Sequence, residues 1–251
     1  LAAKAEGGDL KLHVYKPQDW DPGDKRPAIV FFFGGGWVGG TPGQFYPHCD
    51  HLASKGMVAI SAEYRTKKSH KTDPFSCVED GKSAIRWVRE HAAELGVDPA
   101  KIIAGGGSAG GHVAACTGTL TGFETGNKKV SSAPSAMVLF NPVCDTSPKG
   151  YGTNKLGDRW REISPLHHIS KKLPRPASST AGRTPRRPIK TQPISRQQWQ
   201  RAGSAVNYTL MMMPSTVSLI LVAVTARPTK TRLLKWTLSW QHLAICQKTR
   251  M

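Results

Sequence analysis

Short apolar runs alternate with helical patterns along the first two thirds of this chain. Continuous runs at 27–33 (PAIVFFF), 57–64 (MVAISAEY) and 136–141 (AMVLFN) are typical of strands buried on both faces. Further strands are predicted at 10–15 and 101–105, and helices at 45–55, 76–95 and 108–120, with Gly96 ending the second helix. This alternation predicts an α/β fold, a mostly parallel sheet flanked by helices.

A glycine-rich stretch at 102–113 (IIAGGGSAGGHV) follows a predicted strand and opens a predicted helix. It contains the pattern G-x-S-x-G, in which Gly106 and Gly110 flank Ser108. A nucleophile on a sharp strand-to-helix turn needs a strained backbone and small neighbours, which the glycines provide. The helix N-terminus supplies positive potential where negative charge develops. We therefore predict a nucleophile elbow at Ser108.

The alternative for this stretch is a phosphate-binding turn. The residues after it lack the Gly-Lys-Ser/Thr of a P-loop, and no G-x-G-x-x-G with a downstream acid stands out. The pattern favours the elbow.

A second glycine cluster follows the predicted strand 27–33 directly and precedes Trp37. Successive glycines let main-chain N–H groups point at one spot, as the tetrahedral oxyanion of acyl transfer requires. Losing one such donor costs about 3 kcal/mol of transition-state stabilisation. Together with the serine motif, the cluster predicts an oxyanion hole formed by the N–H groups of Gly35, Gly36 and Ala109.

Four stretches together carry a family resemblance: FFFGGGWVGG (31–40), AEYR (62–65), DGKSAIRWVREHAAELGVDP (80–99) and GGGSAGG (105–111). Over about residues 8–173 the chain resembles the hormone-sensitive-lipase-like, α/β-hydrolase fold-3 group, most closely its acetylesterase and acetylxylan-esterase-like members. The resemblance implies an α/β-hydrolase fold, Ser108 as nucleophile, short acyl ester substrates such as acetylated carbohydrate, and no metal or cofactor. Phe33 stands where the family usually has a histidine, a change expected to affect the rigidity of the glycine loop.

The family's catalytic Asp and His would follow later in the chain, in the order Ser, Asp, His. Residues 174–251 contain no Asp or Glu, and the only histidine beyond His168 is His242. The same segment holds 13 Lys and Arg, so most of the net charge of +18 lies there. We predict a hydrolase domain at 1–173 and an aberrant, irregular or disordered basic tail at 174–251, which leaves the printed chain inactive.

A shifted reading frame near residues 174–176 would explain this tail. Reading each codon from its third base into the next permits two apolar residues and then His-Gly-Gly-x-Asp across 177–184. The same reading permits His-Gly across 224–226. Trp236 has a single codon, so the junction of Trp236 and Thr237 encodes Asp in the shifted frame. The order of these residues matches the missing strand, acid loop and histidine.

Other features suggest neither a cofactor nor a membrane or nucleic-acid partner. The five cysteines lack CxxC spacing, which supports neither a zinc site nor a disulfide framework. The apolar stretch 210–226 is interrupted and at the lower limit for a span, and the tail lacks the interleaved aromatics of nucleic-acid modules. Because the chain starts at Leu1, we expect a truncated N-terminus. Localisation stays open, with secretion or a periplasmic location compatible.

Further side chains near the motifs have weaker roles in this interpretation. His112 lies one helical turn after Ser108 and is expected to pack rather than act as a base, because the nucleophile points away from the helix body. Trp37 either lines a pocket or covers the loop. Loop or site-edge positions are expected for His167 and His168, and site-adjacent packing for Cys144 and Asp145.

Two other functions remain open at this point. The first is a serine peptidase of the same fold. The second is a non-enzymatic protein whose basic tail binds nucleic acid or an acidic membrane, which salt-dependent binding by the tail would support.

Overall fold

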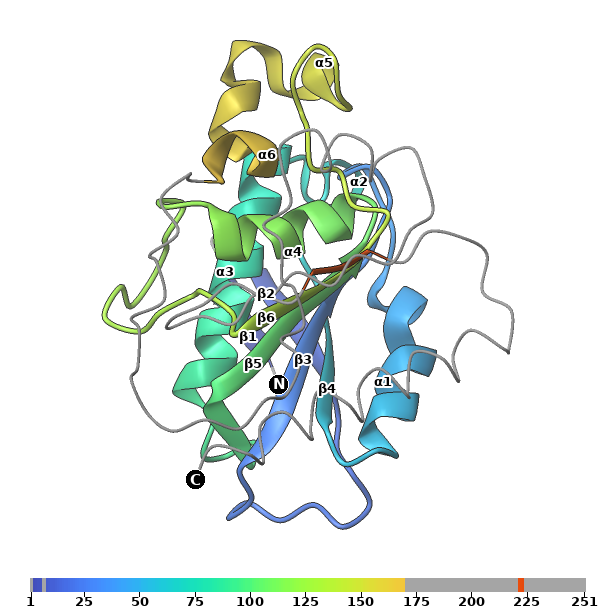
Figure 1. Cartoon of the computed structure of the whole chain (residues 1–251), viewed down its shortest axis with the longest axis vertical. Coiled ribbons are helices and arrows are strands. Elements are labelled where there is room, and N and C mark those ends of the chain that lie inside the picture. Colours follow the sequence, from blue (N-terminus) through green and yellow to red (C-terminus); the bar gives the residue numbers. More distant parts are fainter. Residues whose placement is uncertain (1, 6–7, 170–220, 224–251) are drawn as a thin grey trace, which may run out of the picture.

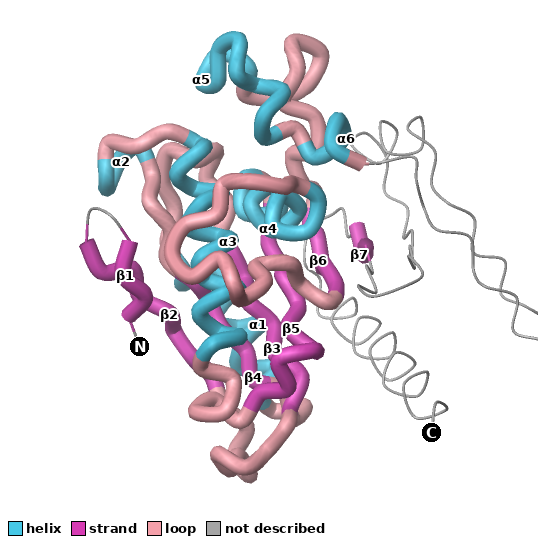
Figure 2. The backbone as a smooth tube through the Cα atoms, turned by 90° about the vertical axis from the view of Figure 1, so that its left-hand side faces the viewer, coloured by secondary structure: helices cyan, strands magenta, loops and turns pink. Residues whose placement is uncertain are grey.

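The computed structural model describes residues 2–5, 8–169 and 221–223, and strands from these ranges form one seven-stranded sheet in the order β1-β2-β4-β3-β5-β6-β7 (Figures 1 and 2). The strands from β3 to β7 run parallel to one another, while β2 pairs antiparallel with β1 and β4. Their bounds are β1 Ala2–Ala5, β2 Gly8–Tyr15, β3 Arg26–Phe32, β4 Val58–Ala62, β5 Val97–Gly107, β6 Ala136–Phe140 and β7 Leu221–Ala223.

Helices α3 and α4 lie on one side of the sheet and α1 on the other, so the central strands are covered on both faces (Figure 1). The segment that carries α5 and α6 lies beyond the C-terminal ends of the strands. The helices are α1 Tyr46–Ala53, α2 Lys67–His70, α3 Pro74–Glu90, α4 Ala109–Thr119, α5 Thr153–Leu156 and α6 Pro165–His168, with 3-10 helices η1 Pro42–Phe45 and η2 Gly157–Ile163. None of the helices in the described ranges is long and apolar enough to cross a membrane.

The core follows from the continuous apolar runs. Every residue of β4, and β3 from Ala28 to Phe32, has no more than a trace of exposed surface. Burying a side chain such as Ile29 or Phe31 stabilises the fold by about 1.5–3 kcal/mol. The mostly parallel α/β sheet predicted from the sequence is therefore confirmed.

Element boundaries differ from the predicted ones where turns intervene. The helix expected to reach residue 95 ends at Glu90, and Gly96 closes the series of turns that follows rather than the helix itself. Gly96 has φ +63°, and a Cβ there would lie 2.6 Å from the Asp21 carbonyl oxygen. The strand predicted at 101–105 extends over Val97–Gly107. The predicted 45–55 helix is shorter, since η1 precedes it.

The predicted tail lies outside the described residues, except for β7. This strand adds Leu221–Ala223 to the sheet beside β6, with Val222 opposite Val138.

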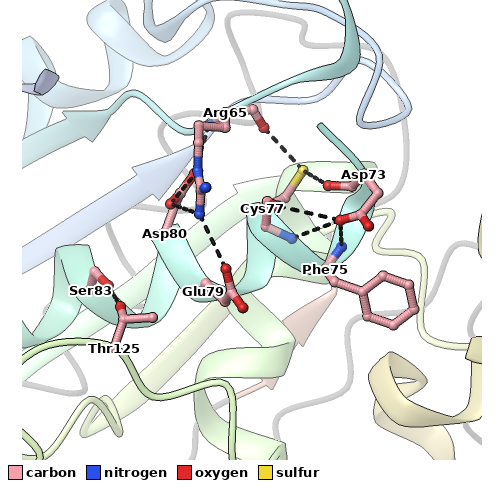
Figure 3. Close-up of polar contacts among 9 residues, drawn as sticks. Arg65, Asp73, Phe75, Cys77, Glu79, Asp80, Ser83 and Thr125 are labelled. Atoms are coloured by element: carbon pink, nitrogen blue, oxygen red, sulfur yellow. Dashed lines mark hydrogen bonds and ion pairs between the residues drawn. The ribbon is translucent and has the colours of Figure 1, made fainter. Parts of the chain in front are cut away.

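A buried ion pair joins the end of β4 to α3 (Figure 3). Both Asp80 oxygens accept hydrogen bonds from Arg65 Nε at 3.0 Å, and Glu79 lies 3.2 Å from the same guanidinium. Glu79 and Asp80 are adjacent in α3 and do not face each other on the helix, but the long Arg65 side chain reaches both. Hydrogen bonding to Asp80 raises the pKa of Arg65. The contact joins the AEYR stretch to the DGK stretch.

Replacing Asp80 by alanine is expected to destabilise the fold by about 3 kcal/mol, because the Arg65 charge loses its buried partner. The Asp80 side chain is 2% exposed and that of Arg65 is 12% exposed. Urea unfolding measures the change. The matched control is Glu162→Ala, which breaks the exposed pair with Arg159 and should cost less than about 1 kcal/mol. Equal effects of the two substitutions would contradict this account.

Candidate active site

Ser108 stands on the turn between β5 and α4 with φ +53° and ψ −119°, a backbone conformation that a non-glycine residue rarely adopts. A Cβ on Gly110 would lie 2.1 Å from the Phe32 carbonyl oxygen, and one on Gly106 would lie 2.4 Å from the Gly110 oxygen. Both flanking positions therefore exclude any side chain. This is the geometry of a strained strand-to-helix elbow that presents a half-buried serine.

The sheet register brings the glycine loop to this elbow. In the parallel pair of β3 and β5, Phe32 lies opposite Gly106, so the segments that follow the two strands leave the sheet side by side. A Cβ on Gly34 would lie 3.3 Å from Ser108 Cβ. The two motifs singled out in the sequence are thus in contact at the C-terminal edge of the sheet, where ligands of α/β folds gather.

Of the N–H groups of the three consecutive glycines 34–36, one has an acceptor in the described part of the chain and two do not. Gly34 N–H donates to Gln44 Oε1 at 2.5 Å. Within the described ranges, the N–H groups of Gly35 and Gly36 have no acceptor. Their φ angles of +140° and +62° turn this part of the loop into the left-handed region. Ala109 is the first residue of α4, where an N–H lacks an intrahelical partner.

Two residues that the sequence analysis did not single out hold the loop in place. Gln44 fixes the Gly34 amide, and the Tyr64 hydroxyl donates to the Phe33 carbonyl at 2.6 Å. The Phe33 ring stacks on Tyr64 with 4.1 Å between ring centroids. Phe33, the residue at the position of the expected histidine, is therefore held by stacking. The AEYR stretch contains Tyr64 and could have indicated its importance. No sequence pattern predicts the role of Gln44.

The side chains of Trp37, in the glycine loop, and His112, in α4, are in contact. Trp37 is 1% exposed, and its indole Nε1–H donates to His112 Nδ1 at 3.3 Å. His112 Nε2 lies 2.6 Å from the Ile163 carbonyl oxygen. Burial lowers the pKa of His112 to about 4. His112 is thus a buried neutral imidazole, as its expected packing role requires, and the buried Trp37 ring packs against it.

The stability of the chain should depend on pH through His112. Its pKa is about 4 when folded, while the unfolded value is near 6.5, so stability is full above pH 6.5 and falls as the pH drops toward 4. The loss should reach about 3 kcal/mol. Urea unfolding of the parent and of His112→Gln between pH 7 and pH 4 measures it as the difference between the two curves. Parallel curves would contradict a neutral buried imidazole.

The remaining candidates near the site make structural contacts. His167 Nδ1 lies 2.8 Å from Ser164 Oγ, and His168 Nε2 lies 2.8 Å from the Arg161 carbonyl oxygen. Asp145 accepts from the Ser147 amide. Burial raises the pKa of Cys144 to about 12, so its thiol stays protonated. In the described ranges, no side chain hydrogen bonds to the Ser108 hydroxyl, so this part of the chain holds the predicted nucleophile but no base in contact with it.

The fold and the elbow together define an α/β hydrolase. The BD-FAE family model matches residues 12–154, more than half of the chain, and the chain belongs to this family.

The relatives and solved structures that this chain resembles include several esterases. It is 36% identical over 111 residues to carboxylesterase NlhH of Mycobacterium tuberculosis, covering 43% of this chain and 33% of that protein. It is 28% identical over 153 residues to an ethyl acetate hydrolase of Pseudomonas putida, covering 61% and 46%. Thermogutta terrifontis esterase 2 in its apo form superposes with a TM-score of 0.63 and 52% identity over 66% of this chain and 65% of that one. The chain thus spans less than half the length of these curated relatives.

Proposed function

We propose that this protein is a serine carboxylic-ester hydrolase that acts on short acyl esters, acetyl esters above all. The observation that carries the proposal is the contact between the strained Ser108 elbow and the loop whose Gly35 and Gly36 amides have no acceptor in the described ranges. Names and structures of similar proteins support the substrate class. One is an ethyl acetate hydrolase, and esterase 2 of Thermogutta terrifontis is known with propionate or butyrate bound.

The mechanism is two-step acyl transfer. Ser108 Oγ attacks the ester carbonyl carbon, and the oxyanion that forms accepts hydrogen bonds from the amides of Gly35, Gly36 and Ala109. The C–O bond to the alcohol then breaks, which leaves an acyl-serine that water hydrolyses. A histidine oriented by an aspartate takes the serine proton and returns it to the leaving alcohol. Phosphorylation of the Thermogutta esterase by paraoxon supports a reactive nucleophile in this group of proteins, which we assign to Ser108.

The aspartate and histidine of this mechanism belong to the part of the fold that follows α6. We propose that residues 174–251 are an aberrant tail read in a shifted frame, so that the printed chain keeps the hydrolase domain at 1–173 but is an inactive form of an active esterase. Seventy-eight residues without one acid, and codons that permit His-Gly-Gly-x-Asp and then His-Gly, support this. Sequencing the gene tests the proposal, and an unbroken frame that encodes the printed tail contradicts it.

A paired substrate assay tests the function itself. The printed chain and a frame-restored chain are each given p-nitrophenyl acetate and a peptide anilide. We expect the restored chain to hydrolyse the ester and not the anilide, and the printed chain to hydrolyse neither. Turnover of the anilide alone would indicate a serine peptidase of the same fold. Salt-dependent binding of nucleic acid by the tail, without esterase activity in either chain, would indicate a binding protein.

A further inference from the structure

His112 connects three segments that are distant in sequence. It lies in α4, where its backbone N–H donates to the Ser108 carbonyl at 3.0 Å, so the helix that presents the nucleophile also carries the imidazole. Nδ1 accepts from Trp37, which ends the glycine cluster. Nε2 faces the carbonyl oxygen of Ile163 in η2, and because a carbonyl only accepts, Nε2 carries the proton. Both ring nitrogens are therefore engaged, and one neutral tautomer is fixed.

The glycine loop depends on an anchor of this kind. Gly35, Gly36 and Trp37 have successive φ angles of +140°, +62° and +62°. For Trp37, a non-glycine residue, this conformation costs about 1–2 kcal/mol. The Trp37 ring contacts the His112 ring edge-on, with 5.1 Å between ring centroids. The buried ring and its hydrogen bond offset the backbone strain and fix where the preceding amides point.

We propose that His112 is a positioning residue that holds the oxyanion loop, residues 34–40, in register with the nucleophile. The inference rests on the proposed function, since that function gives the loop its role. One helix then sets both parts of the site, because Ser108 caps its start and His112, one turn later, contacts Trp37. Donors of an oxyanion hole must be held within about 0.5 Å of the productive geometry, which a rigid, fully bonded support provides.

The geometry does not allow His112 to act as the catalytic base. His112 is fully buried, and neither ring nitrogen is available to receive the serine proton while the contacts to Trp37 and Ile163 persist. A histidine that merely fills space would affect stability and leave the loop unchanged. Variants of His112 and Trp37 distinguish a space-filling histidine from a positioning one.

Two substitutions of His112 keep a side chain of similar size and differ in their hydrogen bonds. His112→Gln can accept from Trp37 and donate to Ile163 through its amide, whereas His112→Leu can do neither. Thr117→Val is the matched control, because Thr117 is a buried residue of the same helix whose hydroxyl donates to the Ala114 carbonyl, away from the loop. Trp37→Phe removes the indole donor and keeps an aromatic ring, which preserves a test if His112→Leu does not fold.

Hydrogen–deuterium exchange of the full chain, read on peptides that cover residues 33–40, tests the proposal without requiring activity. We expect exchange there to rise about tenfold or more in His112→Leu and Trp37→Phe, through easier local opening. His112→Gln and Thr117→Val should match the parent. Parent-like exchange in a folded His112→Leu, or in Trp37→Phe if His112→Leu does not fold, would overturn the proposal.

The rate of Ser108 modification by a fluorophosphonate gives a second readout. In His112→Leu the rate should fall about 100-fold, the size of effect seen when one oxyanion donor is lost, and in His112→Gln it should recover. Parent-like labelling in His112→Leu would overturn the positioning role. If the frame-restored chain with His112 intact is not modified even on long incubation, the proposed function fails, while the exchange experiment still decides whether His112 holds the loop.

Discussion

Replacing Ser108 by alanine in a frame-restored chain is expected to lower kcat for a short acyl ester by at least ~10⁴-fold, because the acyl-serine cannot form. The side chain is half-buried on the elbow, so the loss of one oxygen should leave stability nearly unchanged. Steady-state hydrolysis of p-nitrophenyl acetate, with thermal unfolding of the same preparation, measures both quantities.

The control for this substitution is Ser54→Ala, an exposed serine whose hydroxyl donates to the His51 carbonyl. It should keep parent-like kcat and KM. Activity within tenfold of the parent in Ser108→Ala would place the nucleophile elsewhere. An equal loss in both variants would indicate that assay or folding, and not chemistry, changed.

The second large effect is expected at Gly110. An alanine Cβ there would lie 2.1 Å from the Phe32 carbonyl oxygen and 2.3 Å from that of Phe33. Both atoms are backbone of the central β3 segment, so relief requires moving the sheet or the start of α4. We expect Gly110→Ala to destabilise the fold by about 4 kcal/mol or more. Urea unfolding monitored by far-UV circular dichroism measures the loss.

Gly39→Ala is the matched control, because a Cβ on Gly39 would meet nothing within 4 Å and Gly39 has no positive φ. It should unfold within about 0.5 kcal/mol of the parent. A Gly110→Ala variant as stable as Gly39→Ala would show that the elbow is less tightly packed than the structure indicates.

The sequence predicts the sheet, the elbow and the glycine loop because each depends on local patterns. Apolar runs such as 27–33 predict buried strands, and G-x-S-x-G predicts a turn whose glycines have no room for side chains. Helix ends were less predictable. Helix α3 begins at Pro74, two residues before the predicted start, because Asp73 caps it by accepting from the amides of Phe75 and Ser76.

The supports of the site could not be read from the sequence because they are long-range pairs. Trp37 and His112 lie 75 residues apart, and His112 and Ile163 lie 51 apart. No local periodicity predicts that an imidazole one turn into α4 contacts the indole of Trp37 in the glycine loop. Similarly, Gln44 needs the fold of the η1 turn to reach the Gly34 amide. The predicted oxyanion donors and the nucleophile assignment stay predictions until they are tested chemically.

Mapping the residue modified by a fluorophosphonate probe is the most direct test of the esterase assignment. The printed and frame-restored chains are each labelled and digested, and the modified peptide is sequenced by mass spectrometry. We predict a single modified residue, Ser108, with strong labelling in the restored chain and weak labelling in the printed one. Modification of a different residue, or none in the restored chain, would contradict the account.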